Sequence, residues 1–140
     1  TAQAANYEEG KGTIHAFNSM KIMNILRNEF KNIGEKFDFA CSEGNKYKDG
    51  GKKKNGIGWH GDSERRRVLA MRLGLNPSMP FYYRWKYKHK EIGKIMKWDI
   101  NAGDVMIMSE WAVGTEWKKS SLVTLVHATG ANKYVKPKNN

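Results

Sequence analysis

The sequence predicts a mainly β protein with one helix near its N-terminus. One early stretch places apolar residues at helical spacing, and the rest breaks into short runs of alternating, β-branched and aromatic residues. Gly, Asn and Pro separate these runs. One helix followed by about eight short strands is typical of a β-sandwich or an eight-stranded roll with the helix on its outside.

The helix is expected over Ser19–Phe30. Its apolar residues recur at positions 20, 23, 26 and 30, and Ser19 is a candidate N-cap. The expected strands are Phe37–Cys41, Gly56–His60, Arg67–Leu73, Phe81–Lys88, Lys94–Ile100, Val105–Met108, Leu122–His127 and Lys133–Val135. Turns are expected at residues 49–51, 76–77, 101–103 and 129–132.

The length of 140 residues predicts a single domain over 1–140, with residues 136–140 as a frayed tail. No apolar run approaches the ~20 residues that cross a bilayer, so no membrane association is expected. The single cysteine, Cys41, excludes an internal disulfide and favours a reducing, cytoplasmic compartment. A monomer is expected.

The charge favours a polyanionic partner. Lys and Arg number 25 against 14 acidic residues, which gives a formal net charge of +11. Neutralising phosphates releases counterions, so nucleic acid is an expected partner. A merely solvated basic surface is the alternative interpretation.

The segment Gly58–Arg67 carries the candidate chemistry. His60 and Asp62 are two residues apart near the end of an expected strand, where alternation points both side chains to one side. An imidazole and a carboxylate supply two corners of an octahedral metal site, and one further ligand completes a facial triad. His127 ends a later expected strand and is the candidate third ligand, although most His-x-Asp tripeptides bind no metal.

Three blocks of the chain resemble AlkB-like oxygenases. Asn45-Lys46-Tyr47 resembles the family's Asn-x-Tyr, residues 56–64 (GIGWHGDSE) its Ile-Gly-Trp-His-x-Asp motif with an acidic residue, and residues 103–108 (GDVMIM) its Gly-Asp strand. The blocks run in the family's order between Asn45 and His127. The resemblance implies a double-stranded β-helix (jelly roll) and a dioxygenase that uses Fe(II), 2-oxoglutarate and dioxygen.

The resemblance also implies roles for individual residues. His60 and Asp62 become iron ligands, Asn45 and Tyr47 contacts to 2-oxoglutarate, and Glu64 a contact to the substrate base. Trp59 is interpreted as core packing. Arg65 and Arg66 are either phosphate contacts beside the pocket or a solvated strand edge.

Two positions depart from the family's pattern. The family has a Trp-x-His ligand where this chain reads Glu116-Trp117-Lys118, so His127 must serve as the third ligand or the triad is incomplete. The family also places an Arg on its last strand to hold the far carboxylate of 2-oxoglutarate, and no Arg follows His127. Lys133 and Arg72 are the candidates for that role.

The segment Phe81–Lys90 interleaves aromatic and basic residues. Alternation places positions 83, 85 and 87 on one face and positions 84, 86 and 88 on the other. Trp85 and its neighbours then either stack on bases or form a core face with the lysines in solvent.

The expected function is hydroxylation of a C–H bond on a nucleic-acid base, by oxidative demethylation or base hydroxylation. The alternatives are the same chemistry on a protein or small molecule, or a catalytically silent basic module that binds nucleic acid.

Overall fold

The computed structural model describes residues 2–33, 39–47, 55–74, 78–130, 133 and 135. The chain divides into two compact units, Thr1–Asn45 and Lys46–Asn140, and each is described by itself. The single domain and the helix packed outside the roll therefore stay predictions. The predicted frayed tail, residues 136–140, lies outside the described residues. No helix in the described part of the chain is long and apolar enough to span a membrane.

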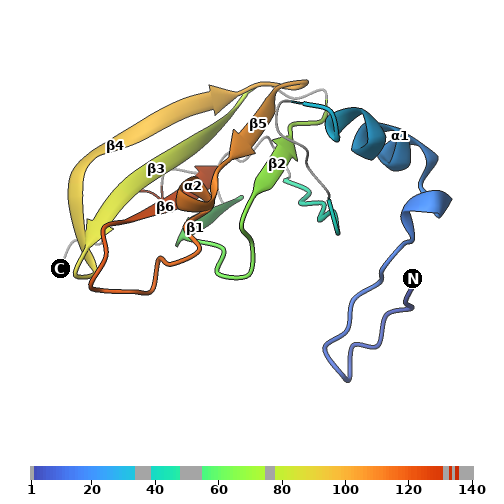
Figure 1. Cartoon of the computed structure of the whole chain (residues 1–140), viewed down its shortest axis with the longest axis horizontal. Coiled ribbons are helices and arrows are strands. Elements are labelled where there is room, and N and C mark those ends of the chain that lie inside the picture. Colours follow the sequence, from blue (N-terminus) through green and yellow to red (C-terminus); the bar gives the residue numbers. More distant parts are fainter. Residues whose placement is uncertain are drawn as a thin grey trace. The chain divides into compact units, whose positions relative to one another are not determined.

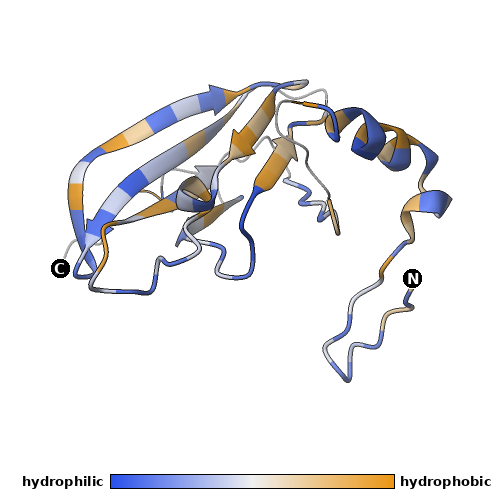
Figure 2. Cartoon of the chain, in the orientation of Figure 1, coloured by the Kyte–Doolittle hydropathy of each residue, from blue (hydrophilic) through white to orange (hydrophobic). Residues whose placement is uncertain are grey.

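The first unit contains a short 3-10 helix, η1 (Phe17–Ser19), and the predicted helix, α1 (Lys21–Phe30). The N-cap prediction is wrong, because the Ser19 hydroxyl donates to the Ala16 carbonyl at 2.8 Å and closes η1 instead. Met20 caps α1 without a side-chain hydrogen bond. The amphipathic pattern of α1 is visible in Figure 2 as alternating apolar and polar stretches along the ribbon.

The second unit is mainly β. Its strands are β1 (Gly56–His60), β2 (Val68–Met71), β3 (Met79–Tyr87), β4 (Lys90–Ile100), β5 (Val105–Met108) and β6 (Thr124–Gly130), with a short helix α2 (Glu110–Val113). A four-stranded sheet has the order β1-β6-β3-β4, and β2 pairs with β5 in a second sheet (Figure 1). Every strand pair is antiparallel.

The predicted strand bounds match β1 and β5 and differ by a few residues for β2, β3, β4 and β6. The predicted strand at Phe37–Cys41 is absent over the described residues 39–41, and its first two residues lie outside the described part. Lys133 and Val135 are not in a strand, and Tyr134 between them is not described. The turn at residues 101–103 is confirmed, with the Asp104 amide donating to the Asn101 carbonyl at 3.1 Å.

Two apolar clusters cover the two faces of the four-stranded sheet. On one face Tyr83 and Leu125 pack with Met108 and Val113, and Phe81, Met96, Val68 and Met106 surround them. On the other face Tyr82 and Ala128 pack with Val135 and Trp59. β2 and β5 are apolar along their lengths (Figure 2), and they contribute Val68, Met106 and Met108 to the first cluster.

The faces of β3 differ from both interpretations of the aromatic-basic segment. Tyr83 is buried as a core aromatic should be, but Trp85 and Tyr87 on the same face are exposed. Arg84, expected in solvent, is 5% exposed, forms an ion pair with Glu91 and lies 4.7 Å from the Trp59 ring centroid. On this face Tyr83 is the last buried residue of β3, although Leu125, opposite Trp85 on β6, is still buried. The predicted strand also extended one residue too far, because Lys88 begins the turn to β4.

Candidate metal centre

His60 and His127 face each other across the β1–β6 pair. β1 contains one extra residue between Ile57 and His60, since Ile57 is opposite Thr129 and His60 is opposite His127. This bulge changes the alternation, so His60 projects from the same face as His127. Without the extra residue, position 59 would be opposite His127 and His60 would point to the other face.

Asp62 completes the group just after the end of β1. Its Oδ1 lies 3.6 Å from Nε2 of His60, and its Oδ2 lies 3.9 Å from Nε2 of His127. The ligand atoms of the three residues all lie within 4.8 Å of one another. Neighbouring ligands of an ion with bonds near 2.1 Å are about 3 Å apart, so contractions of about 1–2 Å would close the group around a cation. The three predicted ligands therefore converge.

The imidazole of His60 is oriented as metal-binding imidazoles usually are. Its Nδ1 lies 2.7 Å from the Gly58 carbonyl oxygen. That carbonyl can only accept, so Nδ1 carries a proton, and Nε2, which faces Asp62, is the nitrogen placed to bind a cation.

His127 is buried and neutral. Burial lowers its pKa from 6.5 to about 4, and the nearby His60 acts in the same direction. Asp62 and a backbone interaction with Ala112 favour the proton but do not outweigh burial. Its Nδ1 is buried and has no well-formed hydrogen bond within the described structure. A neutral buried imidazole whose Nε2 faces the Asp62 carboxylate fits a cation ligand.

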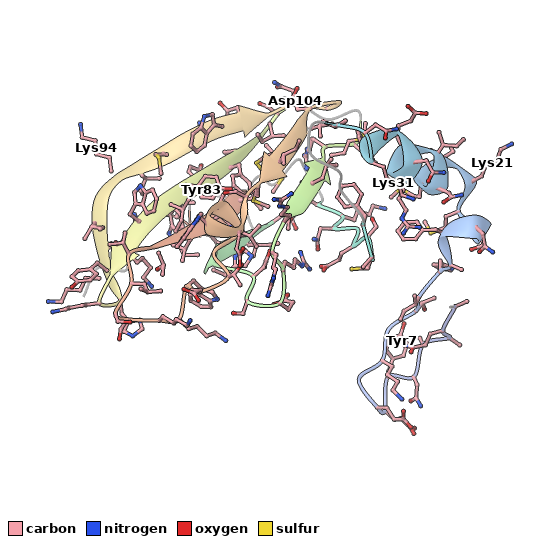
Figure 3. All side chains as sticks on the ribbon, in the orientation of Figure 1. Tyr7, Lys21, Lys31, Tyr83, Lys94 and Asp104 are labelled. Carbon is pink, nitrogen blue, oxygen red and sulfur yellow. The ribbon has the colours of Figure 1, made fainter. Side chains whose placement is uncertain are left out.

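Two aromatic rings enclose His127. Phe81 stacks on its imidazole with centroids 5.6 Å apart and an interplanar angle of 18°. Tyr83, labelled in Figure 3, meets the same ring edge-on at 6.1 Å. Burial raises the pKa of the Tyr83 phenol to about 12, so it stays neutral at ordinary pH. This apolar wall fixes the ring and limits access of water on that side.

A contact between two glycines positions the Asp62 loop. The Asp62 amide donates to the Val113 carbonyl at the end of α2, at 3.0 Å. A Cβ on Gly61 would lie 2.4 Å from the Gly114 carbonyl oxygen and 2.7 Å from the Trp117 ring. Gly114 itself has φ 76°, the left-handed conformation that ends α2. The absence of a side chain at position 61 therefore lets the loop place Asp62 beside His60 and His127.

Of the residues predicted to contact substrate, Arg65 lies closest to the centre. Its Nη1 is 3.5 Å from Oδ2 of Asp62, and its carbonyl accepts from the Thr115 hydroxyl at 2.7 Å. Glu64 and Arg66 are exposed beside it, and Trp85 is on β3.

The predicted 2-oxoglutarate contacts are more dispersed. Arg72 follows β2, and its Nη1 is 3.2 Å from Sδ of Met79. Tyr47 is half-buried, and Lys133 is exposed. Asn45 belongs to the first unit, where its amide donates to Glu43 at 3.4 Å, so the structure does not place it against the triad.

A pocket of about 230 Å³ lies beside α2, not at the triad. Its lining residues are Glu110, Trp111, Gly114, Thr115, Glu116, Thr124 and Leu125. Gly114, which lies against Gly61, and Thr115, which donates to the Arg65 carbonyl, link the pocket to the loop that carries Asp62. We assign the candidate chemistry to the triad, because the triad and not the pocket carries a set of metal donors.

Sequence reasoning missed the residues that support the ligands. Gly58 lies in the Ile-Gly-Trp-His-x-Asp motif, but the motif assigns its carbonyl no role, and Phe81 and the Gly114 turn carry no motif of their own. The sequence from Ser109 to Gly114 could have predicted α2, because a Ser that caps a helix and a Gly that ends it are the usual helix boundaries.

Comparison with known proteins gives one similar sequence. No family model matches the chain, and no solved structure matches it significantly. An uncharacterized protein, R156 of Acanthamoeba polyphaga mimivirus, is 40% identical over 134 residues, which cover 96% of this chain and 51% of that protein. The chain thus spans about half the length of this relative, whose name carries no function.

Proposed function

We propose that this chain is an Fe(II)- and 2-oxoglutarate-dependent oxygenase with an AlkB-like jelly roll, and that it hydroxylates a C–H bond of a nucleic-acid base. The observation that carries the proposal is the convergence of His60, Asp62 and His127 within 4.8 Å. The three come from two paired strands and the loop after one of them. They are the two imidazoles and one carboxylate that the AlkB resemblance implies, with His127 in place of the family's Trp-x-His ligand.

The donor set fits Fe(II). Two imidazoles and one carboxylate on one side of an octahedral ion leave three positions for a bidentate co-substrate and dioxygen. His60, Asp62 and His127 would hold Fe(II), which with 2-oxoglutarate and dioxygen would supply oxidative C–H hydroxylation, coupled to conversion of 2-oxoglutarate to succinate and carbon dioxide. On an N-methyl group the hydroxylated product releases formaldehyde, and on a C-methyl group it remains as hydroxymethyl.

The protein's own residues orient the ligands. The Gly58 carbonyl holds the proton of His60 at Nδ1, which leaves Nε2 free as a donor. Arg65 lies 3.5 Å from Asp62 and counterbalances its negative charge. Phe81 holds the His127 ring in its plane. Together these contacts restrict the three donors to one geometry before a cation arrives.

Co-substrate and substrate contacts follow the resemblance. Asn45 and Tyr47 would donate hydrogen bonds to 2-oxoglutarate, and Arg72 or Lys133 would hold its far carboxylate; Arg72 offers the planar fork that suits a carboxylate. Glu64 would accept from a base amino group. The net charge of +11 favours a nucleic-acid substrate, and Arg65 and Arg66 would contact phosphates.

Anaerobic titration with Fe(II) and 2-oxoglutarate tests the proposal. A bound complex gives a weak visible charge-transfer band, and we expect it for the unaltered chain. Asp62→Ala and His127→Gln should abolish the band and weaken metal binding by more than about 100-fold. His15→Gln, an exposed histidine of the first unit, is the matched control and should leave the band unchanged. Absence of the band in the unaltered chain would refute the proposal.

A second candidate is a catalytically silent module that binds nucleic acid. Two observations favour it: Lys118 stands where the family has a ligand histidine, and no Arg follows His127. Such a module would bind oligonucleotides without Fe(II) and would show no band. If the band appears and only peptides or nucleosides stimulate decarboxylation, the same chemistry acts on another class of substrate.

A further inference from the structure

The tip of the β3–β4 hairpin carries apolar side chains that the core does not cover. Trp85 is opposite Ile92, and Tyr87 is opposite Lys90. Trp85, Tyr87 and Ile92 are 39%, 41% and 38% exposed, whereas Tyr83, two residues earlier on the same face, is 8% exposed. Adjacent exposed aromatic and aliphatic groups of this kind mark an interaction surface more often than scattered ones do.

Positive charge surrounds these rings. Lys88 and His89 form the hairpin turn, and the ammonium of Lys88 lies 5.5 Å from the Tyr87 ring centroid. Lys90 is exposed, and Lys94 of β4 points away from the sheet (Figure 3). The acidic residue of the tip, Glu91, is neutralised by Arg84.

The turn is also tied to a second basic segment. The Lys88 amide donates to the Ser120 carbonyl at 3.1 Å, which brings the exposed Lys118–Ser120 loop to the same end of the sheet (Figure 1). Lys119 in this loop pairs with Glu116, so Lys118 is the ammonium that adds to the positive charge at this end.

We infer that this tip, the hairpin platform formed by Trp85, Tyr87, Ile92, Lys88 and Lys90, binds single-stranded nucleic acid. Residues two apart on a strand are separated by about 7 Å, so Trp85 and Tyr87 present two ring faces in succession. Unpaired bases stack on such rings, while ammonium groups contact the phosphates between them. A duplex hides its base faces and would use only the charges.

The platform lies on the face of the sheet that carries the metal centre. In the β3–β6 pairing Trp85 is opposite Leu125, and Tyr83 is opposite His127, two residues along the same strands. This inference depends on the proposed function at one point, which is that the bound strand is the substrate of the oxygenase. The binding itself requires neither metal nor turnover.

Fluorescence anisotropy tests the platform in the presence of EDTA, with a labelled thymidine homopolymer of about 16 nucleotides. We expect binding, and we expect Trp85→Ser and Tyr87→Ser each to weaken it by about tenfold. Trp85→Phe and Tyr87→Phe should retain most of the affinity. Trp111→Ser, which removes an exposed tryptophan of α2, is the matched control and should change nothing.

The salt dependence separates stacking from charge. Lys88→Gln with Lys90→Gln should reduce the slope of log K against log salt by about 0.7 for each phosphate that the variant no longer neutralises. Lys21→Gln with Lys46→Gln, two exposed lysines elsewhere in the chain, should leave the slope unchanged.

Four outcomes would overturn the inference. The homopolymer does not bind, the serine variants bind as the unaltered chain does, or a duplex of equal length binds as tightly and with the same dependence on Trp85 and Tyr87. A fourth is that the serine variants shift the chain from dimer to monomer without affecting oligonucleotide binding, which would make the face a contact between two copies. None of these outcomes changes the result of the Fe(II) titration, so the proposed function is tested independently of the hairpin platform.

Discussion

Gly61 lies against Gly114, with room for hydrogen but not for a methyl group between them. A Cβ at position 61 would be 2.4 Å from the Gly114 carbonyl oxygen. This contact holds the loop between His60 and Asp62 against the end of α2. A side chain at position 61 should therefore affect both the stability of the fold and metal binding.

Gly61→Ala should destabilise the fold by about 1–3 kcal/mol, because the methyl group meets backbone and the Trp117 ring, which cannot easily move. It should also weaken Co²⁺ binding by displacing Asp62. Urea unfolding and a Co²⁺ titration measure the two effects. Gly44→Ala, where a methyl group meets nothing within 4 Å, is the control and should change stability by less than about 1 kcal/mol. Equal stability of the two variants would show that the loop adapts.

The buried His127 should make stability fall in acid. Its folded-state pKa is about 4 against 6.5 when unfolded, so between these values the unfolded chain binds the proton and the folded chain does not. Stability is therefore retained above pH 6.5 and lost as pH falls toward 4, by about 3 kcal/mol at most. Urea midpoints at several pH values measure it. In His127→Gln the pH dependence over this window should be smaller, and an unchanged dependence would argue against this assignment.

Phe81 should stabilise the position of the His127 ring. Phe81→Ala should destabilise the fold by about 2–3 kcal/mol and lower Co²⁺ affinity by about tenfold, because the imidazole loses its stacked neighbour. Phe81→Leu keeps most of the packing volume and should recover much of the stability. If Phe81→Ala leaves the Co²⁺ affinity unchanged, the ring serves packing alone.

Glu91 should matter for stability far more than an ordinary surface acid. It pairs with Arg84, whose side chain is 6% exposed, so Glu91→Ala leaves a buried guanidinium without its carboxylate. We expect a loss of about 3 kcal/mol, measured by urea unfolding. Asp99→Ala removes an exposed partner of Lys97 and should change stability by less than about 1 kcal/mol. Similar losses for the two variants would mean that the Trp59 ring alone accommodates Arg84.

The β3–β4 turn should tolerate, and gain from, an Asn-Gly sequence. Lys88 and His89 both have positive φ, 47° and 61°, as in a type I′ turn. Lys88→Asn with His89→Gly should therefore raise the thermal midpoint, corresponding to about 1 kcal/mol. A lower midpoint would indicate that the side chains of the turn contribute interactions that outweigh the backbone strain.

The sequence predicted the mainly β composition and the helix near the N-terminus. β-branched and aromatic residues bounded by turn residues placed β1 and β5 at their observed bounds, and the alternating exposure of β5 follows the period of two of a strand with one face against the core. The predictions for Ser19 and Arg84 were wrong, because contacts with other residues outweigh the local preference of each side chain. Ser19 hydrogen-bonds backward to Ala16 rather than capping α1. Arg84 is buried because Trp59 and Glu91 accommodate it, and both are distant from it in sequence or on another strand.

For the candidate site, the sequence alone determined which donors were available: two imidazoles, one carboxylate and their order along the chain. Only the tertiary structure decided that they meet. The bulge between Ile57 and His60 sets the face of one ligand, and the β1–β6 register sets His127 opposite it. Register depends on pairing between segments that are far apart in the chain, and a shift of one residue would turn an imidazole to the other face of the sheet.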